Sequence, residues 1–235
     1  TPMHPSAKPN PWLELLITVA LPALVLMQLS SASRLGPVGA LLLALAFPLG
    51  YGGWRLLLER RVNLMAGLGV VSTLLTGGIG LLALDAQWLA VKEAAIPGVI
   101  GVAVLVSART RHPLVRLLVF NRTLFDVDRV QQALRSRGTE AAFERRLHIG
   151  TLLLAGTFLF SAVANYLLAR WVVTSPAGTE AFNAELARMT LLSYPVIAIP
   201  SMVMMMAVLY FLSRSANQLT GLTLEQMLHA SSDKA

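Results

Sequence analysis

Two adjacent ionisable residues, Lys92 and Glu93, lie inside an apolar stretch that is long enough to cross a bilayer. Trp88 precedes them by one helical turn, and Pro97 follows them. An ionisable residue within a spanning helix costs free energy, and such residues commonly mark a substrate or ion pathway. The pair is therefore the first candidate for a binding site in this chain.

The functional interpretation of the pair is that Lys92 or Glu93 faces a helix bundle and lines a polar cavity. The expected neighbours are Glu14 or Asn165, with Tyr166 beside Asn165 in the sequence. Glu93 carries this interpretation further than Lys92, because its shorter side chain reaches less far toward the headgroups.

The alternative interpretation of the same charges is structural. Asp85, Trp88 and Lys92 have the spacing i, i+3 and i+7, so they share one helix face near the membrane interface. Trp88 then anchors the helix at the headgroups, and Lys92 extends past it into water. The residues alone leave both interpretations open.

The composition is that of a membrane protein. Of 235 residues, 13% are charged and 55% are hydrophobic, and the mean hydropathy is +0.65. Soluble domains average about 25% charged and about 45–50% apolar residues. We expect an all-α, polytopic integral membrane protein with a single membrane domain over residues 1–235.

Composition also limits the chemistry. The chain has no Cys, which excludes disulfides, thiolate metal sites and Cys nucleophiles. Its four His lack paired metal-ligand spacing, and no Ser/His/Asp set can be assigned. The net charge of +7 comes without a nucleic-acid-binding motif. We therefore expect no metal, no cofactor, no nucleic acid and no enzymatic activity.

Six apolar segments are each long enough to cross a bilayer, which takes roughly 20 helical residues. They cover residues 11–30, 40–58, 62–84, 88–108, 147–172 and 189–213. In the third segment, small residues recur at intervals of four, as Gly69, Thr73 and Gly77 and as Thr76 and Gly80. This spacing predicts close packing between helix backbones.

A basic loop, residues 109–146, separates the fourth and fifth segments. Its nine Arg and four acidic residues give a net charge of +5. Residues 113–125 predict a helix on the membrane surface, and a second short amphipathic helix is expected between Asp126 or Asp128 and Gly138. The candidate contacts with anionic lipid headgroups or partner proteins are Arg109, Arg111, Arg116 and Arg122.

The charge distribution predicts the orientation of the chain. With six spans and the N-terminus inside, the inner segments hold fifteen of the 19 Lys and Arg residues and the outer segments hold four. Such an excess of basic residues is typical of cytoplasmic segments. Both termini and the basic loop are therefore predicted to be cytoplasmic.

The two halves of the chain share a weak sequence similarity. Trp12 and Pro22 are ten residues apart in the first segment, and Trp88 and Pro97 are nine apart in the fourth. Three spans per half would make the halves an inverted 3+3 repeat, with a site at their interface, as in many transporters.

Aromatic, basic and small polar residues recur at the segment ends: Tyr51 with Trp54 and Arg55, Trp88 with Lys92, Ser107 with Pro113 and Leu114, and Ala164, Asn165 and Tyr166 with Trp171. Their order resembles the bacterial intracellular septation protein A family, also called inner membrane-spanning proteins, and its six-helix relatives. The resemblance covers residues 40–210. It implies a non-enzymatic protein of the bacterial inner membrane that supports cell-envelope integrity or division through lipid or protein partners.

Two other functions are consistent with the residues. Lys92 and Glu93, the paired Pro195 and Pro200 and the predicted repeat indicate a small secondary transporter or channel. An accessory subunit of a larger membrane complex, or a homo-oligomer, is the third hypothesis. A cavity that reaches Lys92 and Glu93 would favour transport.

Overall fold

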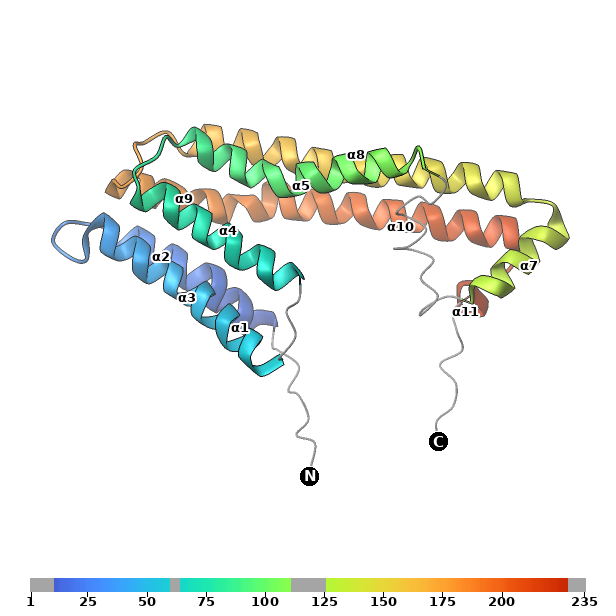
Figure 1. Ribbon diagram of the computed structural model, residues 1–235, viewed down its shortest axis with the longest axis horizontal. Coiled ribbons are helices and arrows are strands. Elements are labelled where there is room, and N and C mark those ends of the chain that lie inside the picture. Colours follow the sequence, from blue (N-terminus) through green and yellow to red (C-terminus); the bar gives the residue numbers. More distant parts are fainter. Residues whose placement is uncertain (1–10, 60–63, 111–125, 228–235) are drawn as a thin grey trace, which may run out of the picture. The chain divides into compact units, whose positions relative to one another are not determined.

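The computed structural model describes residues 11–59, 64–110 and 126–227, and their regular structure is entirely helical (Figure 1). This confirms the predicted all-α class. The chain forms two compact units: unit 1 comprises Thr1–Glu93 and Asn165–Val196, and unit 2 comprises Ala94–Ala164 and Ile197–Ala235. The helices α5 (Gln87–Ser107) and α8 (Glu140–Val172) each contribute one end to each unit.

Unit 1 is built mainly from the N-terminal helices. Its complete elements are α1 (Pro11–Leu15), the π-helical segment η1 (Leu16–Ala20), α2 (Leu21–Leu29), α3 (Gly36–Glu59), α4 (Leu64–Leu81) and α9 (Glu180–Ser193). The helix α3 packs against both α2 and α4, as Figure 1 shows, and α9 packs against α2 and α3.

A proline stands two residues after the end of each π-helical segment. Pro22 is the second residue of α2, which follows η1. Pro200 is the second residue of α10 (Ile199–Thr220), which follows η2 (Tyr194–Ala198). Proline lacks an N–H group and clashes with the carbonyl one turn earlier, and a π turn is one of the irregularities that a helix adopts at such sites.

Two glycines allow the backbones of α3 and α4 to approach closely. A Cβ atom on Gly77 would lie 2.6 Å from Leu45 Cδ1, and one on Gly80 would lie 2.5 Å from Leu41 Cδ2. Leu41 is only 1% exposed, so its side chain has little room to move. The predicted close packing of the small residues is confirmed at these two positions.

Polar contacts hold α9 in unit 1. The Glu185 carboxylate accepts hydrogen bonds from the N–H and hydroxyl groups of both Thr174 and Ser175, at 2.8–3.2 Å. The buried Asn183 amide donates to Ser30 Oγ at 3.0 Å, which ties α9 to the end of α2. Together these contacts fix the position and rotation of α9 against the end of α2.

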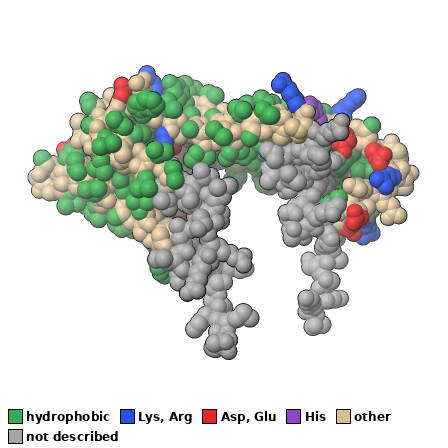
Figure 2. Space-filling model, viewed as in Figure 1, with side chains coloured by type: hydrophobic (Ala, Val, Ile, Leu, Met, Phe, Trp, Pro, Cys, Tyr) green, Lys and Arg blue, Asp and Glu red, His purple; other side chains and the backbone are tan. Residues whose placement is uncertain are grey.

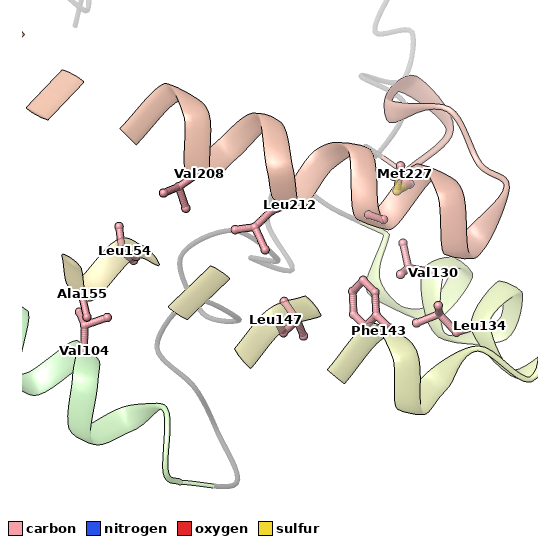
Figure 3. Packing of buried hydrophobic residues seen from close by; sticks show 11 residues of the cluster. Val104, Val130, Leu134, Phe143, Leu147, Leu154, Ala155, Val208, Leu212 and Met227 are labelled. Atoms are coloured by element: carbon pink, nitrogen blue, oxygen red, sulfur yellow. The ribbon is translucent and has the colours of Figure 1, made fainter. Parts of the chain in front are cut away.

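Unit 2 contains α7 (Val127–Arg137), α10 and α11 (Leu224–Met227), with the remaining parts of α5 and α8. All five helices contribute to one hydrophobic core, which Figure 3 shows. Its labelled members are Val104, Val130, Leu134, Phe143, Leu147, Leu154, Ala155, Val208, Leu212 and Met227. Through this core the mostly polar helix α7 packs against the apolar helices α8 and α10.

The short helix predicted within the basic loop is confirmed as α7. The Asp126 carboxylate caps it by accepting the N–H of Arg129 at 3.0 Å, and Gly138 ends it with φ 64°. Gly adopts this left-handed conformation at little cost, which makes it the usual residue after a helix. Residues 113–125, predicted as a surface helix, lie outside the described residues.

Five described helical stretches are long and apolar enough to cross a membrane: Trp12–Leu29, Gly36–Trp54, Gln87–Ser107, Glu140–Val172 and Glu180–Thr220. Large apolar side chains are exposed on them, and Figure 2 shows hydrophobic side chains over much of the described face. An apolar surface of this extent indicates a multi-pass membrane protein. The predicted third span, residues 62–84, is not among these five; in the part of it that the structure describes fully, Val71–Leu81 is a shorter apolar helix.

Two predicted boundaries were wrong. The fifth segment was expected to begin at residue 147, but α8 begins at Glu140 and has 33 residues. The sixth segment was expected to begin at residue 189, but its helical run begins at Glu180 with α9 and continues through η2 and α10. Charged residues set the predicted limits, although they can continue a helix beyond the bilayer core of about 30 Å.

Gly80→Ala is expected to lower the free energy of unfolding by about 1–3 kcal/mol, the usual cost of overpacking, because the new methyl group meets the buried Leu41. The matched control is Gly78→Ala, whose Cβ meets nothing within 4 Å. Thermal unfolding in detergent micelles measures both. Equal unfolding temperatures for the two variants would contradict the close α3–α4 packing.

Candidate functional site

A cavity of about 170 Å³ lies inside unit 1, among η1, α2, α3, α4, α9 and the start of α5. Most of its lining is apolar and includes Pro22 and Pro48. The polar lining consists of one carboxylate and five hydroxyl residues, namely Glu93, Thr18, Ser72, Thr73, Thr76 and Thr190. Most of these elements belong to helical stretches apolar enough to cross a membrane, so the cavity is a polar site in apolar surroundings.

Lys92 reaches from α5 to α4. Its Nζ donates to Thr76 Oγ1 at 2.7 Å and to Ser72 Oγ at 3.2 Å, and it forms an ion pair with Glu93 Oε1 at 2.6 Å. An ammonium group has three N–H donors, so these three acceptors match its capacity. The Lys92 side chain is 10% exposed, and it does not extend past Trp88 into water as the anchor interpretation required.

The start of α5 decides how this pair is oriented. The Asp85 carboxylate accepts the N–H of Gln87 at 2.8 Å and supports the helix where it begins. Leu89, in the first turn, is fully buried, whereas its neighbour Trp88 is 56% exposed. Glu93 is four residues after Leu89 and shares its inward face, because residues four apart lie above one another on a helix.

Three of the cavity threonines donate their hydroxyl protons to backbone carbonyls four residues earlier in the same continuous run of helix. Thr18 donates to the backbone carbonyl of Glu14 at 2.7 Å, Thr76 to that of Ser72 at 3.0 Å, and Thr190 to that of Leu186 at 2.9 Å. A hydroxyl group has one donor and two acceptor positions. These oxygens can therefore still accept hydrogen bonds, as Thr76 does from Lys92.

The structure brings together two of the five residues predicted for the solute site. Lys92 and Glu93 are paired, and Glu93 lines the cavity. Glu14 contacts the hydroxyl of the cavity residue Thr18 through its backbone carbonyl, but it is not part of the lining. Asn165 and Tyr166 do not line the cavity, and Tyr166 is 41% exposed.

Of the four arginines predicted for a lipid or partner surface, the structure describes only Arg109, which is exposed just beyond the end of α5. Arg111, Arg116 and Arg122 lie outside the described residues. This surface stays a prediction.

Sequence reasoning did not assign Ser72, Thr76, Thr18 or Thr190 to the site. The available signal was the group of hydroxyls Ser72, Thr73 and Thr76 in an otherwise apolar segment. The four-residue spacing of Thr76 and Gly80 was interpreted only as helix packing. This row serves both helix packing and the site, because Gly80 faces α3 and Thr76 accepts a hydrogen bond from Lys92.

In the described part of the chain, no three His, Cys, Asp or Glu side chains lie close enough together to hold a metal ion. No family model, curated protein or solved structure matches this chain. The function is therefore argued from the geometry of the cavity.

Lys92→Met is expected to lower the free energy of unfolding by about 1–3 kcal/mol, between the cost of breaking an exposed ion pair and that of breaking a fully buried one, because it leaves the partly exposed Glu93 carboxylate without its cation. The double variant Lys92→Met/Glu93→Gln removes both charges and should recover most of this loss. Thermal unfolding in micelles measures all three proteins.

The matched control is the exposed ion pair between Arg135 and Glu140, whose atoms lie 3.3 Å apart with side chains 74% and 60% exposed. Arg135→Met should cost about 0–1 kcal/mol, as surface pairs do. If Lys92→Met costs no more than Arg135→Met, the lower exposure of the ion pair in unit 1 adds nothing to its contribution to stability.

Proposed function

We propose that this protein is a small secondary transporter whose solute site is the unit 1 cavity. The observation that carries the proposal is a cavity lined by a carboxylate and hydroxyls, next to the Lys92–Glu93 ion pair, whose side chains are only 10% and 25% exposed within apolar helices. A structural bundle gains little from such a pair, because desolvation offsets most of the attraction between the charges. Ionisable residues in this setting commonly serve a substrate or ion pathway.

The size of the cavity limits the solute. Its volume of about 170 Å³ compares with about 30 Å³ for each water molecule in the liquid. Pockets for drug-sized ligands are about 300–1,000 Å³. The cavity therefore suits a small polar solute and excludes a nucleotide or an oligosaccharide.

The role in envelope integrity or division stays a prediction from the family resemblance, and so does the role of accessory subunit. Six spans and an inverted repeat also stay predictions. For transport, the chain needs only a solute site between helices that cross the membrane, which the five apolar helical stretches can provide.

We further propose the bacterial inner membrane as the location, with both termini and the basic loop in the cytoplasm. The test uses single cysteines, because the chain has none of its own. In whole cells, an impermeant thiol reagent should label Glu180→Cys and leave Arg129→Cys unlabelled, since positive residues collect on the cytoplasmic side. Both positions are exposed. Labelling of Arg129→Cys alone would reverse the orientation.

Transport itself is tested in proteoliposomes with three radiolabelled solutes of different charge: methylammonium, glycine and acetate. At least one should show saturable uptake above that of protein-free vesicles. Glu93→Gln should lower this uptake at least about tenfold, because a hydrogen bond to a charged group contributes about 1.5–3 kcal/mol. The control Glu140→Gln, at an exposed site, should keep it. Uptake of none of the three, or equal uptake by Glu93→Gln, would overturn the proposal.

A further inference from the structure

The cavity is rich in hydrogen-bond acceptors and poor in donors. Its described lining contains a carboxylate and hydroxyls but no Arg, Lys, His, Trp, Asn or Gln side chain. Three of the five hydroxyl protons, those of Thr18, Thr76 and Thr190, already bind backbone carbonyls. A solute that supplies donors of its own therefore matches this lining better than one that offers only acceptors.

Lys92 marks where such donors bind. Its ammonium group sits among three oxygens, Glu93 Oε1 at 2.6 Å, Thr76 Oγ1 at 2.7 Å and Ser72 Oγ at 3.2 Å. All three of these residues also line the cavity, whereas Lys92 does not. The Lys92 side chain thus places a primary ammonium group at the cavity wall. The three oxygens that bind this group belong to residues that also line the cavity.

We propose that the cavity binds the ammonium group of a small primary amine, which competes with the tethered ammonium of Lys92 for Glu93, Ser72 and Thr76. The inference rests on the proposed function in one respect, that this cavity takes a solute. An anion is disfavoured because the lining presents a carboxylate and oxygen acceptors. A quaternary ammonium has the charge but lacks the N–H donors that the three oxygens need.

Competition between Lys92 and a free amine for the same three oxygens predicts how a substitution of Lys92 changes amine binding. Lys92→Met removes the tethered ammonium and keeps an unbranched side chain, which leaves the acceptors open to a free amine. Glu93 then lacks a cation until one binds. Methylammonium, the smallest primary alkylammonium, should therefore bind this variant more tightly than it binds the wild-type protein.

The experiment measures binding to full-length protein in micelles by the rise in unfolding temperature, which follows ligand concentration relative to Kd. Methylammonium chloride is titrated against tetramethylammonium chloride, sodium chloride and sodium acetate at equal ionic strength. Lys92→Met should bind methylammonium at least about tenfold more tightly than wild type. The double variant Lys92→Met/Glu93→Gln should show no specific rise.

Equal stabilisation of Lys92→Met by tetramethylammonium or sodium would overturn the proposal, because charge alone would then suffice. Stabilisation by acetate, or no effect of methylammonium, would also overturn it. If Lys92→Met does not fold, the wild-type protein provides the test: Glu93→Gln must weaken methylammonium binding at least about tenfold and Glu140→Gln must not.

This binding measurement does not depend on flux. Amine binding without uptake in proteoliposomes would retain the ligand class and overturn transport. Uptake of acetate without amine binding would retain transport and overturn the ligand class.

Discussion

The arrangement of unit 1 depends on one constraint: a lysine and a glutamate that lie among apolar helices must find their partners inside the protein. Lipid tails supply no hydrogen bonds, so an unsatisfied charge there is very costly. Lys92 meets this constraint with Glu93 and two hydroxyls of α4. The contacts fix how α5 and α4 face each other and place the carboxylate of Glu93 at the wall of a cavity.

Two prolines line the cavity, and two close-packed glycines lie in α4, the helix that supplies three of its hydroxyls. Gly77 and Gly80 bring α4 close to α3, and Pro22 follows the π turn of η1. Pro22 and Pro48 both line the hollow. Irregular helices in a membrane persist only where protein or water satisfies the freed backbone groups. In unit 1, close packing and irregular turns thus occur together with a polar site.

Unit 2 is held together by apolar packing rather than by polar contacts around a cavity. Its core joins five helices through mainly aliphatic side chains, and the polar helix α7 attaches to it through Val130 and Leu134. The charged side chains of α7 include Arg135, whose ion pair with Glu140 is open to solvent. The Lys92–Glu93 pair in unit 1 is partly buried and the Arg135–Glu140 pair in unit 2 is exposed, so the contribution of an ion pair to stability can be compared at two degrees of exposure.

The sequence by itself determined the helical class, the membrane setting and the short helix capped by Asp126 and Gly138, because hydropathy and capping are local properties. It also identified Lys92 and Glu93, since charges are conspicuous in an apolar segment. Only the tertiary structure decided that Lys92 points inward, that Thr18, Ser72, Thr76 and Thr190 meet Glu93 around one cavity, and that Asn165 and Tyr166 do not line it. These facts depend on the rotation and packing of separate helices, which no local pattern records.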